Sequence, residues 1–171
     1  NLTLYEDTTM TAVSGEIMLQ DAFALTNIGP IIGQEYLKLK IKTPSLVEEG
    51  SIIDFTENVF LINSIQNRSS AGNNIQVYIL NFTTSELVKN QRTTISRSLK
   101  GSYSDIVKKL LKEDLDCKKD IYIEPTSGNK KIVMPNMKPF DVIKMASKES
   151  ISKLISFPTI PNYIFYETLK G

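Results

Sequence analysis

Residues 55–82 read FTENVFLINSIQNRSSAGNNIQVYILNF and contain the two strongest β-strand signals of the chain. The ends of this stretch, residues 55–65 and 75–82, are rich in β-branched and aromatic side chains, which favour extended structure. Between them, residues 67–74 consist mainly of turn-forming Asn, Ser and Gly, so we predict a β-hairpin with a long tip. Residues 75–82 are apolar on both faces, which predicts a central strand, or a strand with one face against a partner.

Residues 36–42, YLKLKIK, alternate between two kinds of side chain. The odd positions from Leu37 to Ile41 are apolar, and the even positions from Lys38 to Lys42 are lysines. This period of two predicts a half-buried strand with a solvated face, where lysines discourage pairing between sheet edges. A basic stripe for an anionic partner is the alternative interpretation. Further strands are expected at residues 2–4, 13–19 and 92–99.

The composition of the chain changes near residue 100. Residues 1–100 carry 8 basic and 10 acidic side chains, whereas residues 101–171 carry 12 and 9. In the second part, Ser102 offers an N-cap to an amphipathic run that extends to Leu115, and Pro139 suits the first turn of another helix. Short strands are predicted at residues 121–123, 131–134 and 163–168, a turn at 125–129 and a loop at 150–161.

These signals predict a mainly β fold with an α+β part. We place a domain boundary near Lys100–Gly101, so that a β domain over residues 1–100 precedes a small α+β domain over residues 101–171. A length of 171 residues fits one domain or two small ones.

The overall composition excludes several classes of protein. Hydrophobic residues make up 41% and charged residues 23% of the chain, which is ordinary for a globular protein and excludes a disordered tail. No apolar run approaches the ~18–20 residues that a membrane-spanning helix needs. A net charge of +1 argues against a general electrostatic grip on nucleic acid.

Missing residue types limit the available chemistry. The chain has no histidine, which removes Ser-His-Asp and Cys-His catalysis and histidine metal sites. Cys117 is the only cysteine, so an internal disulfide and a cysteine-only zinc site are excluded. The carboxylates are scattered and form no convincing acid–base pair. The sequence therefore predicts no catalytic, cofactor-binding or metal-binding residue, no cofactor and no enzymatic activity.

Three local features have both a functional and a structural interpretation. Two lysines after Cys117 would lower its pKa, but an unreactive thiol at the surface or half-buried beyond a helix end is favoured. Four acids between Glu113 and Asp120 resemble a cation site, but no glycine lies among them and interleaved lysines favour a solvated surface. The sequence GNKK at residues 128–131 lacks the strand–loop–helix context of a phosphate-binding loop, so a turn is favoured.

The order of short motifs along the chain is more informative than any single motif. The set comprises residues 2–7 (LTLYED), 14–22 (SGEIMLQDA), 30–35 (PIIGQE), 43–44 (TP), 78–86 (YILNFTTSE), 95–101 (ISRSLKG), 124–126 (EPT), 135–140 (PNMKPF) and 163–168 (YIFYET). In this order the motifs resemble the baseplate central hub proteins of contractile-tailed, myovirus-type bacteriophages. The resemblance covers nearly the whole chain, and residues 148–161 depart from the family pattern.

The resemblance implies a structural role. Hub subunits of this kind have tail-tube-like β-barrel domains, and three of them form a homotrimeric ring between the tail tube and the central spike. The expected partners are other copies of the chain, the tail tube protein, the central spike protein and other baseplate proteins, with DNA only in passage and no stable membrane binding. The expected location is the virion, after synthesis in the host cytoplasm. The family continues with a further β segment, so we expect the chain to be a fragment of a longer protein.

Two other classes of function remain alternatives. A receptor- or glycan-binding β domain of a phage tail fibre usually presents aromatic side chains on loops, and the loops at residues 67–74 and 126–130 contain none. A carboxylate-based glycan hydrolase needs no histidine, but it does need a coherent pair of carboxylates, which the sequence does not show. The hub interpretation is therefore preferred.

Overall fold

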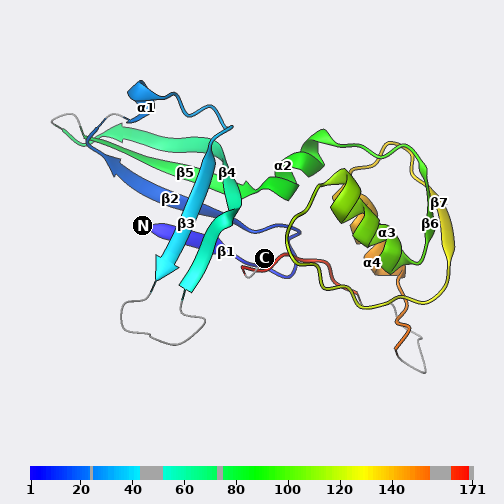
Figure 1. Cartoon of the computed structure of the whole chain (residues 1–171). Coiled ribbons are helices and arrows are strands. Elements are labelled where there is room, and N and C mark those ends of the chain that lie inside the picture. The colour runs from blue at the N-terminus through cyan, green and yellow to red at the C-terminus, as the bar shows by residue number, and fades with distance from the viewer. Residues whose placement is uncertain (24, 43–51, 73–74, 155–162, 170–171) are drawn as a thin grey trace. The chain divides into compact units, whose positions relative to one another are not determined.

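Figure 1 shows the computed structural model of the chain, which describes residues 1–23, 25–42, 52–72, 75–154 and 163–169. The chain forms two compact units. Unit 1 comprises Asn1–Glu6, Ala12–Ser85 and Thr168–Lys170, and unit 2 comprises Asp7–Thr11, Glu86–Glu167 and Gly171. The boundary expected at Lys100–Gly101 lies within a strand of unit 2, β6 (Ser98–Gly101). The motif at residues 43–44 lies outside the described residues.

The described part of unit 1 is built on one antiparallel sheet of five strands in the order β1-β2-β5-β4-β3. The strands are β1 (Leu2–Tyr5), β2 (Ser14–Asp21), β3 (Tyr36–Lys42), β4 (Ile52–Ser70) and β5 (Gln76–Thr84). A short helix, α1 (Leu25–Ile28), lies in the connection from β2 to β3. Figure 1 shows the sheet curling, with β3 and the start of β4 turned away from the direction of β2 and β5. The observed fold is thus mainly β, with a curled antiparallel sheet and a few helices.

The two best strand predictions in unit 1 are confirmed. β5 lies at the centre of the sheet, and Tyr78, Leu80 and Phe82 are buried on one of its faces. β3 has the predicted bounds and alternation, with Leu39 buried. It forms one edge of the sheet, where lysines on the solvated face suit a strand that must not pair with other chains by accident.

The hairpin of β4 and β5 is also confirmed, but its tip is shorter than predicted. β4 continues to Ser70, through residues that the sequence pattern assigns to the turn. The pairing register shifts between Gln66 and Ser69, where Asn67 has a left-handed φ of 53°, a conformation that Asn tolerates better than most residues. This irregularity lets the strand pairing continue past a polar stretch.

One face of the curled sheet holds the core of unit 1. Phe60 lies between Phe55 and Phe82, with ring centroids 4.7 and 5.0 Å from its own. Val13 and Leu39 complete this buried cluster. Because the described residues of unit 1 form no second sheet, the curl of its one sheet is what encloses these side chains.

Unit 2 contains the longer helices and a two-stranded antiparallel sheet. Its elements are α2 (Ser85–Arg92), β6, α3 (Tyr103–Lys109), a π-helical turn η1 (Leu110–Asp114), β7 (Lys130–Val133) and α4 (Pro139–Glu149). The predicted N-termini of α3 and α4 are confirmed. The Oγ of Ser102 caps α3 by accepting from the N–H of Asp105, and Pro139 opens α4.

Three strand predictions in unit 2 are wrong. Residues 92–99 pair as a strand only from Ser98 onward: Arg92 ends helix α2, and residues 93–97 are irregular apart from an isolated bridge between Ile95 and Met137. Residues 121–123 form no strand, and β7 pairs with β6 instead. Residues 163–168 belong to neither of the described sheets. Residues 121–123 and 163–168 are short runs, in which periodicity alone does not establish a strand. The loop expected at 150–161 lies partly outside the described residues.

Gly15 on β2 has no room for a side chain. A Cβ there would lie 2.5 Å from Phe82 Cζ and 2.6 Å from the carbonyl oxygen of Thr3. We expect Gly15→Ala to lower the free energy of unfolding by about 1–3 kcal/mol in urea denaturation, because the core must shift. Gly29→Ala is the control, since a Cβ at Gly29 would meet no described atom within 4 Å. Equal stability of the two variants would contradict this packing.

Candidate assembly surface

The connection between β2 and β3, residues 22–35, is unusually apolar for a surface segment. It has no charged residue between Ala22 and Gln34, whereas loops on protein surfaces are usually polar. We call residues 22–35 the covering segment, because its Ile31 packs over a second buried cluster of the sheet, formed by Ile62, Tyr78 and Leu80.

Asp21, the last residue of β2, holds the start of the covering segment. Its buried carboxylate accepts from the N–H of Phe23 through Oδ1 at 2.9 Å and from the N–H of Leu25 through Oδ2 at 2.7 Å. Oδ2 also accepts from the hydroxyl of Tyr78 at 3.2 Å. Burial raises the pKa of Tyr78 above its ordinary value, so the phenol stays protonated and remains a donor.

Thr26 and Arg68 hold the middle of the covering segment. Arg68 Nη2 donates to Thr26 Oγ1 and to Gln76 Oε1, both at 2.9 Å. Arg68 Nε also donates to Gln76 Oε1 at 3.1 Å, and the Thr26 hydroxyl donates to the same oxygen at 3.3 Å. These bonds tie α1 to the end of the β4–β5 hairpin. The sequence predicts a turn at Arg68, but these bonds hold Arg68 in strand β4.

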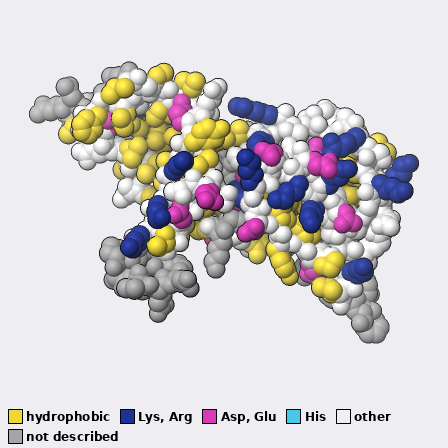
Figure 2. Space-filling model, in the orientation of Figure 1, with side chains coloured by type: hydrophobic (Ala, Val, Ile, Leu, Met, Phe, Trp, Pro, Cys, Tyr) yellow, Lys and Arg dark blue, Asp and Glu magenta, His cyan; other side chains and the backbone are white. Residues whose placement is uncertain are grey.

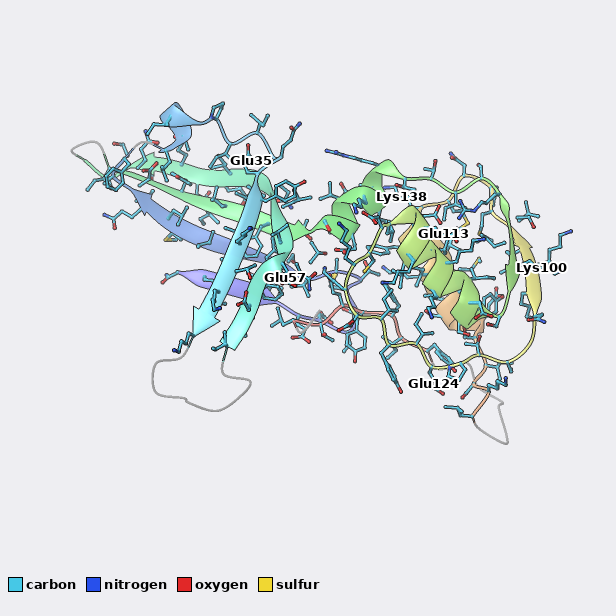
Figure 3. All side chains as sticks on the ribbon, in the orientation of Figure 1. Glu35, Glu57, Lys100, Glu113, Glu124 and Lys138 are labelled. Carbon is cyan, nitrogen blue, oxygen red and sulfur yellow. The ribbon has the colours of Figure 1, made fainter. Side chains whose placement is uncertain are left out.

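Glu35 holds the end of the covering segment, where Figure 3 shows it at the start of β3. Its carboxylate accepts from three consecutive backbone N–H groups, those of Ile32, Gly33 and Gln34, at 2.9, 2.9 and 3.1 Å. These bonds, the one from Ile32 first, lower the pKa of Glu35. Its own carbonyl oxygen accepts from the N–H of Ile62 at 3.0 Å, which fixes the turn to β4.

The outward side of the covering segment is apolar and exposed. Phe23 is 81% exposed, Leu25 50%, Ile28 77% and Ile32 69%. Leu25 and Ile28 are three positions apart on α1 and therefore share one face of the helix. Figure 2 shows hydrophobic side chains over this end of unit 1. We call these four residues the apolar face. Large apolar side chains held outward by a well-bonded backbone are typical of a contact surface.

The sheet edges offer two further surfaces. β1 and β3 each have one side that pairs with no other described strand. On β3, Lys40 is ion-paired with Asp54 at 2.7 Å, and this bond is the main cause that lowers the pKa of Asp54 to about 2. Near the β1 edge, Leu2, Tyr5 and Met18 are exposed apolar side chains. The register places Leu2 on the core face beside Ile17, and places Tyr5 and Met18 on the opposite face with Glu16.

Cys117 is not a reactive thiol. It is buried, whereas the sequence pattern favoured a surface or half-buried position. Burial raises the pKa of Cys117 above its ordinary value, and this outweighs the attraction of Lys119. The lowered pKa that two neighbouring lysines suggested is therefore wrong, because the protein interior disfavours the thiolate.

The four acids between Glu113 and Asp120 do not converge on one point. Asp114 pairs with Arg97 at 2.6 Å, and Asp116 pairs with Lys89 at 3.2 Å, which lowers the pKa of Asp116. In the part of the chain that the structure describes, no group of three or more Cys, Asp or Glu is placed to hold a metal ion. The GNKK sequence forms a bend and then enters β7 rather than opening a helix.

The most buried charges of unit 2 form a cluster that the sequence did not predict. Lys119 Nζ bonds to Glu86 Oε2 at 2.8 Å and to the carboxylate of Glu167, and the side chains of all three are 9–12% exposed. Burial alone would lower the pKa of Lys119, but the two carboxylates outweigh it and raise this pKa, so the ammonium stays charged. No local pattern could have revealed the cluster, because its acids lie 33 and 48 positions from Lys119.

Comparison with known proteins identifies no family for this chain. No model of a protein family matches the chain, and no curated protein matches it. Among the described helices, none combines the length and apolar character needed to cross a membrane.

The carboxylate of Glu35 should control the order of the turn that it binds. We expect Glu35→Gln to speed the hydrogen exchange of the amides of Ile32, Gly33 and Gln34 at neutral pH. In the wild type, a lowered pKa means that protection is complete above the unfolded-state pKa and is lost as the pH falls through the folded-state pKa. Intrinsic-rate-corrected exchange of these amides at several pH values checks both points. Glu57→Gln on β4 is the control, and an equal effect there would contradict the assignment.

The buried cluster of Lys119 should be sensitive to loss of its cation. We expect Lys119→Met to lower the free energy of unfolding by about 3–5 kcal/mol, because two buried carboxylates lose their counter-charge. Lys89→Met removes an exposed ion pair and should cost less than about 1 kcal/mol. Urea denaturation of both variants at pH 7 checks the difference. Similar small losses would show that the cluster contributes little.

Proposed function

We propose that the chain is a structural, non-enzymatic subunit of a phage baseplate central hub, in a ring that joins the tail tube to the central spike and passes DNA. The observation that carries this proposal is the sheet of unit 1, which curls round its own core yet leaves β1 and β3 with unpaired edges among the described residues. A tail-tube-like barrel module that is extended by neighbouring chains requires such a sheet.

The motifs that carry the family resemblance support a structural role. Gly15 allows the close approach of Phe82, Asp21 and Glu35 bind backbone N–H groups, and Pro139 begins a helix. Each of these motif residues fixes a turn, a packing contact or a helix end. Residues with these roles are what a family of scaffold proteins would share, whereas an enzyme family would share reactive groups.

The distribution of charge also suits a channel. Unit 1 has five basic and eight acidic residues, a net charge of −3, and unit 2 has 15 basic and 11 acidic residues, a net charge of +4. A channel lined by the acidic unit would let DNA pass without holding it, because tight binding needs many cations facing the phosphates. The same charges favour contacts between unlike units of neighbouring copies.

A receptor- or glycan-binding β domain is the second candidate function, and Tyr122 is the observation that favours it. Tyr122 lies between η1 and β7 and is 96% exposed. An exposed aromatic ring on a loop offers an apolar surface with a polar tip, which is suited to packing against a sugar ring. Tyr122 lies outside the loops at residues 67–74 and 126–130, which contain no aromatic side chain.

The oligomeric state of the full-length protein tests the hub proposal. We expect light scattering to give three times the mass of one chain, which is 19.2 kDa for the 171 residues here, scaled to the length of the protein used. Negative-stain images should show a three-fold ring with a central hole. A monomer, both alone and mixed with the candidate spike protein, would refute the proposal. Loss of glycan-array binding on Tyr122→Ala would then support the second candidate.

A further inference from the structure

We propose that the side chains of Lys119 and Glu167 join in an intramolecular amide bond, and that Glu86 moves the proton during this reaction. Lys119 Nζ contacts the Glu167 carboxylate directly and lies 2.8 Å from Glu86 Oε2. The ion-paired cluster is the state that precedes the bond. All three residues belong to unit 2, and the proposal does not depend on the hub function.

Burial favours the amide over the ion pair. The side chains of Lys119 and Glu86 are each 9% exposed, and that of Glu167 is 12% exposed. Two ions lose much of their hydration in such a place, whereas a neutral amide of nearly the same size has far less hydration to lose. Little water reaches the reacting groups, so hydrolysis of the bond is also suppressed.

The fold holds the two reacting groups in contact. They lie 48 positions apart in sequence, so only the tertiary structure brings them together. Next to Glu167 in the chain, Phe165 packs on Phe140 of α4, with ring centroids 5.6 Å apart. On the other side of the cluster, the Cys117 thiol donates a hydrogen bond to Glu86. Groups that are well oriented react as if their partner were present at on the order of 10⁵ M or more.

Glu86 is the second carboxylate that the reaction needs. One carboxylate balances the charge of one ammonium, but Lys119 binds two, so the cluster holds an excess negative charge. A carboxylate within hydrogen-bond distance of the nitrogen can accept its proton and return it to a leaving group. Glu86 is therefore placed to act as a general base and then as a general acid.

The reaction is a condensation that releases one water. The Lys119 ammonium first passes a proton to the Glu167 carboxylate, which gives a neutral amine and a neutral acid. The amine nitrogen then forms a bond to Cδ of Glu167. Glu86 accepts a proton from this nitrogen and donates it to the hydroxyl on Cδ, which departs as water. Glu86 ends as a carboxylate, and no oxidant or further reactant is needed.

The bond closes a covalent loop over residues 119–167. Glu167 is followed by Thr168, at which the chain passes from unit 2 to unit 1. The bond therefore fastens the chain to unit 2 at the point where it leaves that unit. A loop of this kind also restricts the unfolded chain, as a disulfide does.

Mass spectrometry of the full-length wild-type protein tests the proposal. After a week at pH 7, the denatured protein should be lighter than its sequence by the mass of one water. Trypsin does not cleave after an acylated lysine, so digestion should yield residues 119–130 joined to residues 154–170 in one branched peptide. A protein that keeps its full mass, or a lighter protein without this branched peptide, would overturn the proposal.

Glu86→Gln tests the proton carrier, because it keeps the contact between Lys119 and Glu167. We expect the branched peptide to form at least about 100-fold more slowly than in the wild type, with an unchanged circular dichroism spectrum. Formation at the wild-type rate would overturn the role of Glu86.

Cys117→Ala is the matched control, because it removes the other nucleophile beside Glu86. We expect this variant to lose one water as the wild type does. If the loss of water disappeared with Cys117 in a folded variant, the product would be a thioester with Glu86, and the proposed amide would be wrong.

Discussion

The packing of Phe60 between Phe55 and Phe82 is the contact on which unit 1 depends. The three rings come from β4 and β5, and the sheet that carries them must curl to shield them, since the described residues of unit 1 provide no second sheet. Gly15 allows Phe82 to pack this closely, because any side chain there would collide with the Phe82 ring. Curling brings the apolar sides of the five strands together but leaves the outer edges of β1 and β3 unpaired among the described residues. Further strands could pair with these two edges.

The covering segment adds apolar side chains both to the core and to the surface of unit 1. Its inner residue, Ile31, adds to the buried cluster around Tyr78, while its outer residues remain in water. Carboxylates at both ends, Asp21 and Glu35, hold it by accepting backbone N–H groups, which lets an uncharged stretch stay ordered without being buried.

Unit 2 is organised differently. Its helices bury apolar side chains, but its most specific contact is the ammonium of Lys119 between the carboxylates of Glu86 and Glu167. Such a cluster adds little net stability compared with apolar packing, yet it penalises any arrangement that separates its members. The cluster therefore favours one conformation of the residues around Glu167. The sequence pattern predicts a strand at these residues.

Local features of this protein could be predicted from the sequence because they depend on neighbours along the chain. The alternation of residues 36–42, the apolar faces of residues 75–82, the cap at Ser102 and the start at Pro139 are of this kind. The lack of charge in residues 22–34 was equally visible, but the sequence alone did not single it out.

Only the tertiary structure decided the rest, because burial and pairing depend on residues that are distant in sequence. The predicted strand at residues 92–99 is reduced to β6, which begins at Ser98 after an irregular segment. β6 pairs with β7, and Cys117 is buried. The structure also shows that Phe23, Leu25, Ile28 and Ile32 are exposed, whereas Ile31 packs inward. The free energy of an apolar side chain depends on what packs against it, and a linear pattern does not contain that information.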